Sequence, residues 1–226
     1  MEIISASDEV VITNMGITYL SYTFSPSFGR FKDLKQNATK LQNFLKSCEN
    51  TPDLYDVKIK TKNNEEYISL TAKKPQFKPL SEQDITLTIE DISSITTALC
   101  NTLEQARNQN IYHLDIGFHT ICYDNSLYKV EIIDWFDSIL SKPPIKPPIY
   151  ITENIPPELK LNKNTITEKE LIRAENYQVS CILVKLLRIA NINIPQVIQY
   201  GCSDEIDERP TLKTIKQSIE ELQATY

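Results

Sequence analysis

The stretch YHLDIGFHTICYDNSLYKVEIIDWFDS, residues 112–138, holds two aspartates, one at each end of a predicted hairpin. Asp115 follows His-Leu and precedes the first strand-like segment, while Asp134 follows the Ile-Ile that ends the second. Both segments are rich in β-branched and aromatic residues, and Asp-Asn-Ser separates them, which is the pattern of two strands joined by a tight turn. The sequence therefore predicts a hairpin with a carboxylate at each of its two chain ends.

The composition limits the class of protein. A chain of 226 residues suits one large domain or two closely packed lobes. The net charge of −6 and the lack of a cluster of Lys and Arg argue against nucleic-acid binding. Five widely spaced cysteines without a Cys-x-x-Cys pair, and only two histidines, argue against a zinc site and indicate reduced thiols.

The N-terminal sequence MEIISASDEV is acidic and has neither the basic nor the apolar region of a signal peptide. No run of about 18 apolar residues occurs, because Lys185 and Arg188 interrupt the most apolar segment, residues 181–192. We therefore expect a cytoplasmic protein without membrane insertion. The abundance of Lys, Asn and Ile is typical of an AT-rich genome, so the cytoplasm of a host cell is the alternative location, for a secreted microbial effector.

Glycine is scarce in this chain. The four glycines are Gly16, Gly29, Gly117 and Gly201, and no two of them are close in sequence. Loops that bind phosphate through their backbone need clustered glycines, because glycine allows a close approach and positive φ. The chain therefore has neither a G-x-G-x-x-G motif nor a P-loop.

The first 73 residues have the pattern of about four strands and one helix. Residues 9–24 form two β-branched runs around Asn-Met-Gly, and a second alternating pair flanks Lys-Asn-Asn-Glu at 62–65. Between these hairpins, apolar residues recur at helical spacing from Phe31 to Cys48. A proline-containing linker, residues 73–83, then ends this β-rich part.

The rest of the chain is mainly helical around the hairpin described above. Thr88 with Asp91, and Thr167 with Glu170, have the spacing of capping boxes that begin two long helices. A third helix is expected after Pro210. These patterns predict an α+β fold with a small β-rich lobe at 1–80 and a larger helical lobe at 81–226.

Five motifs, in order, resemble those of eukaryotic-type protein kinases. HLDIGFHTI resembles the catalytic loop H-R-D-L-x-x-x-x-N, IIDWF the D-F-G region, IPPELK the A-P-E motif, ENYQVSCILVKLL the D-x-W-S-x-G-C-I-L-x-E-L-L helix, and ERPTLKTIKQSIEEL the closing R-P-T segment. The resemblance extends from about Glu9 to Leu222 and implies a single two-lobed, protein-kinase-like domain. The other interpretation is an unrelated α+β adaptor in which both aspartates are solvated turn residues.

The resemblance also implies roles for individual residues. Asp115 takes the position of the catalytic base, and Asp134 that of the magnesium ligand. His113 takes the position of a core-packing residue. Glu158 and Arg209 take the positions of a buried ion pair that supports the helical lobe.

Other positions lack what the family's chemistry needs. If the turn at Gly16 joins the second and third strands, the chain begins after the strand that precedes the glycine loop, and the N-lobe is truncated. The remaining departures are Tyr22 at the strand lysine, Ala38 to Lys40 at the helix glutamate, Leu114 at the arginine, Gly117 at the phosphate-contacting lysine, Thr120 at the metal-binding asparagine, and Trp135 and Phe136 at Phe-Gly. Most phosphoryl-transfer catalysis is positioning and electrostatic stabilisation, and those groups are the missing ones.

The sequence therefore favours a catalytically impaired pseudokinase that acts through another protein in signalling or regulation, with a compact helical lobe and no cofactor. Its partner is expected to be a protein and not nucleic acid. The alternative is a divergent, active phosphotransferase that uses Asp115 and Asp134 with Mg-ATP.

Overall fold

The computed structural model describes residues 2–146, 151–160 and 164–226. By its internal contacts the chain divides into two compact units, Met1–Gln76 and Phe77–Tyr226. The sequence placed this boundary at residues 80 and 81, within the same linker. Each unit is described by itself below.

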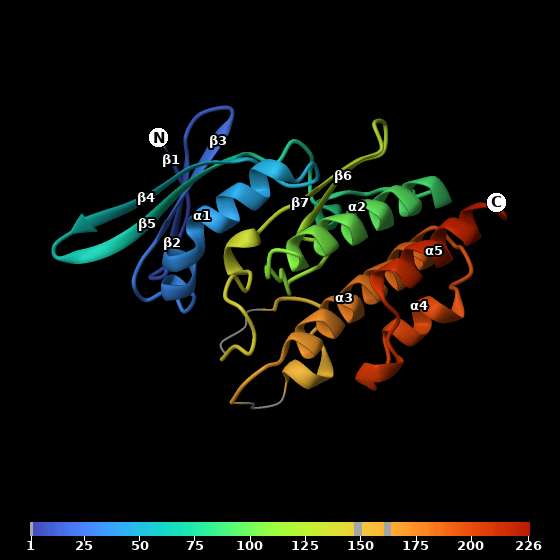
Figure 1. The fold of residues 1–226 in the computed structure, drawn as a ribbon. Helices are drawn as coiled ribbons and strands as arrows, with labels where there is room; N and C mark the ends of the chain where they lie inside the picture. The colour runs from blue at the N-terminus through green and yellow to red at the C-terminus, as the bar shows by residue number, and fades with distance from the viewer. Residues whose placement is uncertain (1, 147–150, 161–163) are drawn as a thin grey trace. The chain divides into compact units, whose positions relative to one another are not determined.

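The first unit is a five-stranded antiparallel sheet with one helix (Figure 1). Its strands are β1 (Glu2–Ala6), β2 (Val10–Asn14), β3 (Tyr19–Phe24), β4 (Leu54–Lys62) and β5 (Glu65–Lys73), in the order β1-β2-β3-β5-β4. The helix α1 (Phe31–Ser47) connects β3 to β4 and contacts β4. Both predicted hairpins and the predicted helix are present.

The helix α1 forms because its apolar residues share one face. The buried residues of α1 are Phe31, Leu34, Ala38, Leu41, Phe44 and Leu45. Their spacing of three and four residues gives an apolar stripe along the helix. The stripe packs in the core of the unit together with Leu54, Ile68 and Leu70 of the sheet, all of which are fully buried.

Strand β1 corrects the expectation of about four strands. The predicted absence of the strand before the glycine-loop position is wrong, because β1 pairs antiparallel with β2. All five residues, Glu2–Ala6, are exposed. The strand therefore lacks the alternation of buried and exposed positions that an apolar and polar sequence pattern would indicate. The link to β2 has no glycine; instead, the Ser7 hydroxyl accepts hydrogen bonds from the backbone N–H groups of Glu9 and Val10 at 3.3 and 3.0 Å.

In its described residues, the second unit consists of α-helices, one hairpin, short 3-10 helices and irregular segments. Its α-helices are α2 (Ile89–Arg107), α3 (Glu168–Ile189), α4 (Gln196–Gly201) and α5 (Leu212–Gln223), and its hairpin is β6 (Ile121–Asp124) with β7 (Lys129–Ile132). Helix α2 contacts α3, α5 and β7, and α3 contacts α4 (Figure 1). The predicted capping boxes are both present, at Thr88 with Asp91 and at Thr167 with Glu170. The short helix α4 was not predicted.

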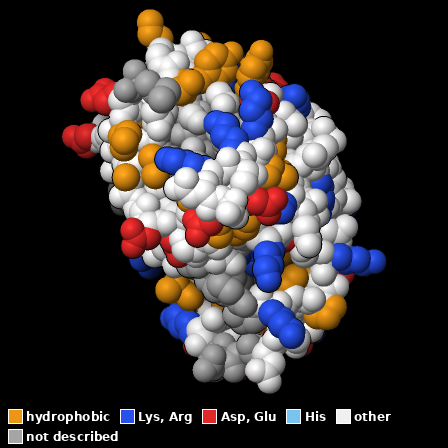
Figure 2. Space-filling view, turned by 90° about the vertical axis from the view of Figure 1, so that its left-hand side faces the viewer, with side chains coloured by type: hydrophobic (Ala, Val, Ile, Leu, Met, Phe, Trp, Pro, Cys, Tyr) orange, Lys and Arg blue, Asp and Glu red, His pale blue; other side chains and the backbone are white. Residues whose placement is uncertain are grey.

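The exposed surface mixes side chains of all kinds. On the face drawn in Figure 2, positive and negative side chains are interspersed with hydrophobic ones. Among the residues that the structure describes, no helix combines the length and the apolar character needed to cross a membrane.

Glu158 and Arg209 form the buried ion pair that the sequence predicted. Arg209 donates two nearly parallel hydrogen bonds, from Nη1 to Glu158 Oε1 at 2.7 Å and from Nη2 to Oε2 at 2.9 Å. It also donates to the carbonyls of Ser203 and Arg173 at 2.9 and 3.1 Å, and its guanidinium lies 4.8 Å from the ring centre of Tyr177. Both charged groups are thus buried with their hydrogen bonds satisfied, which a planar guanidinium achieves better than a lysine.

We predict that Arg209→Ala lowers the free energy of unfolding by about 3–5 kcal/mol, because it leaves the Glu158 carboxylate buried without a counter-charge. Chemical denaturation followed by circular dichroism measures this loss. Glu205→Ala is the matched control, since Glu205 is exposed in the same loop. An Arg209→Ala chain as stable as the control would contradict the assignment of Arg209 as a structural anchor.

Candidate functional site

The loop before β6 is held by a buried histidine. His113 is 1% exposed, its Nε2 lies 2.7 Å from the Ile133 carbonyl, and its Nδ1 accepts a hydrogen bond from the Asp115 N–H at 3.3 Å. Burial lowers the pKa of His113 to about 4, so the ring is neutral at pH 7 and donates through Nε2. The edge of its ring also packs against Trp135, with 4.5 Å between ring centres. His113 is therefore placed as a core residue.

Two buried polar residues of α3 fix the backbone of this loop. Glu175 Oε1 accepts from the His113 N–H at 2.7 Å, and Gln178 Nε2 donates to the Leu114 carbonyl at 2.7 Å. Both side chains are fully buried. Sequence reasoning does not single them out. The signal that could have identified them is the group of polar residues, Glu175, Asn176, Gln178 and Ser180, among the apolar buried residues of α3.

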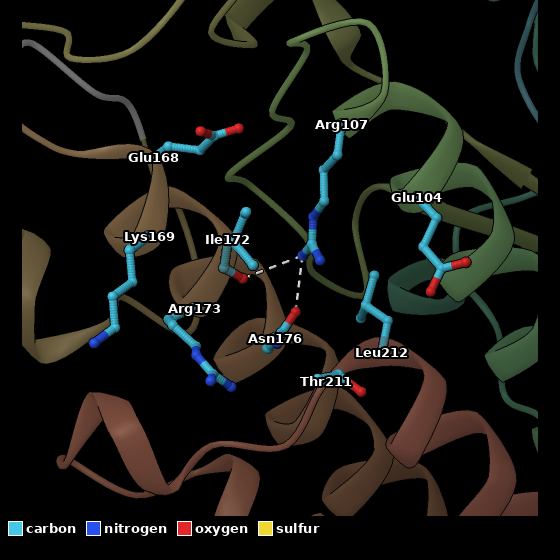
Figure 3. A pocket seen from close by; sticks show the side chains of 9 residues that line it. All are labelled: Glu104, Arg107, Glu168, Lys169, Ile172, Arg173, Asn176, Thr211 and Leu212. Atoms are coloured by element: carbon cyan, nitrogen blue, oxygen red, sulfur yellow. Dashed lines mark hydrogen bonds between the residues drawn. The ribbon is translucent and has the colours of Figure 1, made fainter.

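Arg107 of α2 completes this support. Its Nε donates to Glu175 Oε2 at 2.7 Å, and its Nη2 donates to Asn176 Oδ1 at 2.8 Å and to the Ile172 carbonyl at 3.1 Å. Figure 3 shows Arg107 reaching from α2 toward α3 along the wall of a pocket of about 550 Å³. The arginine thus joins the two long helices and neutralises the buried carboxylate of Glu175.

Leu114, which precedes Asp115, and Asp134 itself have left-handed backbones. Leu114 has φ of 59°, and Asp134 has φ of 64°. Such a conformation costs an L-residue roughly 1–2 kcal/mol and persists only where the surroundings impose it. Leu114 is held by Gln178 and buried in an apolar cluster that includes Tyr112 and Ile139. The residue at the family's arginine position therefore fills the core.

Asp115 is enclosed by three hydrogen-bond donors. The Thr152 N–H donates to Oδ1 at 2.6 Å, the Thr152 hydroxyl donates to Oδ2 at 2.9 Å, and His119 Nε2 lies 3.1 Å from Oδ2. Burial acts to raise the pKa of Asp115, but the hydrogen bonds from His119 and Thr152 outweigh it and the pKa is lowered. Each oxygen of the carboxylate at the catalytic-base position therefore already accepts at least one hydrogen bond.

His119 lies among carboxylates. Besides its contact with Asp115, its Nδ1 lies 3.5 Å from Glu153 Oε1. The hydrogen bond with Asp115 raises the pKa of His119, and the charges of Asp115, Glu153 and Asp134 act in the same direction against partial burial. The hydrogen bond and the nearby carboxylates therefore favour the protonated form of His119.

The residues that replace the family's lysine and asparagine allow this arrangement. A Cβ atom on Gly117 would lie 2.5 Å from His119 Nδ1, so the histidine occupies space that a side chain at 117 would need. The buried Thr120 hydroxyl accepts from the Gly117 N–H at 3.0 Å and lies 3.1 Å from the carbonyls of Asp115 and Gly117. Thr120 therefore closes the loop on itself.

Asp134 is the remaining carboxylate at a metal position. Burial raises its pKa, so the site favours its charged form less than water does. It precedes a 3-10 turn, Trp135–Asp137, whose Trp135 is buried and donates from Nε1 to the Ile132 carbonyl at 2.7 Å. Among the described residues, no group of three or more His, Cys, Asp or Glu side chains could hold a metal ion.

The oxygen atoms at the possible metal positions fit magnesium poorly. Asp115 is engaged with its neighbours, the Thr120 hydroxyl bonds within the loop, and Asp134 is desolvated. Magnesium requires oxygen ligands in near-octahedral geometry. The absence of a cofactor remains a prediction.

In the first unit, Tyr22 lies on β3 between Ile12 of β2 and Leu70 of β5. The single acidic residue of α1 is Asp33, in its first turn, so the helix has no carboxylate at residues 38–40. A lysine and glutamate pair like that of the kinases therefore has neither member at these positions.

We predict that the two imidazoles titrate far apart. By NMR, His119 should titrate above its ordinary value of 6.5, and His113 near 4, because one faces carboxylates and the other is buried. The Asp115→Asn variant should lower the pKa of both rings, because the charge of Asp115 raises both, and more strongly that of His119, which also hydrogen-bonds to it. Equal titration of both rings in the native chain would contradict the contact between His119 and Asp115.

Comparison with known proteins gives a likeness in structure alone. Neither the models of protein families nor the curated proteins include a match. Among solved structures, the chain is similar to the kinase PK-1 of Cydia pomonella granulovirus, with a TM-score of 0.67 and 13% identity over 95% of this chain and 91% of that one. The expected α+β class is confirmed and the unrelated α+β fold is wrong: the chain has a protein-kinase-like fold.

Proposed function

We propose that this chain is a catalytically impaired protein-kinase-like module that acts by binding another protein. The observation that carries the proposal is the enclosure of Asp115 by His119 and Thr152. A general base must reach the proton that it removes, and it works best with a pKa near the working pH. Asp115 has its oxygens occupied and its pKa lowered, so it is poorly suited to accept the proton of a substrate hydroxyl.

The distribution of retained and replaced residues supports the same proposal. The contacts that hold the helical unit together are intact, namely Glu158 with Arg209 and Glu175 with Arg107. The positions that would contact phosphate or metal carry Gly117 and Thr120. A positioned base supplies only about 10²–10⁴-fold of rate, whereas charge stabilisation and positioning supply most of phosphoryl transfer.

A divergent phosphotransferase is the second candidate. The left-handed backbones of Leu114 and Asp134 favour it, because strained conformations cluster at active sites. In this alternative, binding of Mg-ATP separates Thr152 and His119 from Asp115. The two candidates differ in whether nucleotide binds.

We predict that millimolar Mg-ATP leaves the melting temperature of the full chain unchanged. A ligand present at 100 times its Kd would add about 2.7 kcal/mol of stability, which a thermal-shift assay detects. The matched control is the Asp134→Asn variant, which removes the carboxylate at the metal position. A magnesium-dependent rise in the native chain that is lost in Asp134→Asn would support the phosphotransferase.

We also predict that Asp115→Asn leaves binding of the protein partner unchanged. In this proposal the chain acts by binding and not by phosphoryl transfer, so the carboxylate at the catalytic-base position is not needed. Affinity capture followed by titration of the captured protein measures the Kd for both chains. Arg209→Ala serves as the control for loss of fold, and it should abolish capture. Loss of binding in Asp115→Asn, with the melting temperature preserved, would show that this carboxylate has a functional task.

A further inference from the structure

Two cysteines of the second unit lie side by side although they are 21 residues apart in sequence. Cys181 is on α3 and Cys202 follows the last residue of α4. Their Sγ atoms are 3.4 Å apart, and both residues are partly exposed. The remaining cysteines, Cys48, Cys100 and Cys122, are buried. Only the first two therefore combine proximity with access to solvent.

The close approach of α3 and α4 positions this pair. Gly201 lies directly against Ser180, so a Cβ atom at 201 would be 1.8 Å from the Ser180 hydroxyl oxygen. Glycine is needed here because it alone leaves room for that contact. Since Ser180 and Gly201 immediately precede Cys181 and Cys202, their contact brings the two sulfur atoms to the same place.

The two thiols have different surroundings. The two sulfur atoms are within hydrogen-bond distance, and this contact lowers the pKa of Cys181 and raises that of Cys202. Tyr177 also hydrogen-bonds to Cys181, and the positive charges of Lys185 and Arg209 act on it in the same direction. The thiolate is the reactive form of cysteine, so Cys181, whose pKa is the lowered one, is the nucleophile of the pair. By contrast, burial raises the pKa of Cys100 and Cys122 to about 12.

We propose that Cys181 and Cys202 are a modification site, a dithiol that peroxides oxidise reversibly to a disulfide between α3 and α4. The Cys181 thiolate attacks hydrogen peroxide, so an S–O bond forms, the O–O bond breaks, and the released hydroxide takes up a proton to become water. The sulfur of Cys202 then attacks that of Cys181, so the S–S bond forms and the S–O bond breaks. The proton of Cys202 leaves with the hydroxyl group as a second water.

In total, two thiols and one peroxide give one disulfide and two waters, and a small dithiol reduces the disulfide again by thiol exchange.

A metal site is the other use of paired cysteines. Among the described residues, however, no third His, Cys, Asp or Glu completes a metal-binding group here. The site is independent of whether the chain transfers phosphate, since it involves none of the loop residues around Asp115.

The test is treatment of the folded full-length chain with hydrogen peroxide. Free thiols should fall from five to three per chain, since two of the five cysteines are consumed. Mass spectrometry after trypsin should find residues 174–185 joined to residues 189–213, and dithiothreitol should restore all thiols. The oxidised chain should melt at a higher temperature, because the cross-link restricts the unfolded chain.

Two conservative variants separate the steps. In Cys202→Ser, peroxide should leave a sulfenic acid at Cys181 that dimedone labels. In Cys181→Ser, Cys202 should stay unlabelled and all remaining thiols free. An unchanged thiol count in the native chain, a cross-link that involves Cys48, Cys100 or Cys122, or a covalent dimer would each overturn the proposal.

Discussion

A single buried carboxylate organises much of the helical unit. Glu175 is completely buried on α3, and an ion in that position costs several kcal/mol unless it is paired and hydrogen-bonded. Arg107 supplies the charge from α2, and the His113 N–H supplies a hydrogen bond from the loop before β6. The hydrogen bonds and the ion pair of this one side chain therefore connect α2, α3 and the loop that carries Asp115. Gln178, one turn further along α3, hydrogen-bonds to the next peptide of that loop.

Around this anchor, the site has become a closed network of side chains. Gly117 leaves space that His119 fills, and Thr120 uses its hydroxyl within the loop. Thr152 then covers Asp115 from a segment 37 residues away. The loop is therefore stable in a conformation that leaves the carboxylate of Asp115 occupied.

The sequence was most informative where a local pattern determines the structure. The hairpin, both capping boxes and helix α1 follow from spacing, and the pairing of Glu158 with Arg209 followed from motif order, since 51 residues separate them. Strand β1 was missed because an exposed edge strand carries no alternation. The contact of His119 with Glu153, and the nearness of Cys181 and Cys202, depend on how distant segments pack, so no spacing in the sequence encodes them. The contact of His119 with Asp115, by contrast, spans only four residues.

The contributions of the two histidines to stability depend on pH in opposite directions. The folded pKa of His113 lies below its unfolded value, so its contribution is full above pH 6.5 and is lost as the pH falls toward 4. His119 has the reverse sign: its contribution is full below pH 6.5 and disappears as the pH rises through its raised folded pKa. Considered through these two rings alone, the helical unit is most stable close to pH 6.5, and both acidification and alkalinisation loosen the same short loop.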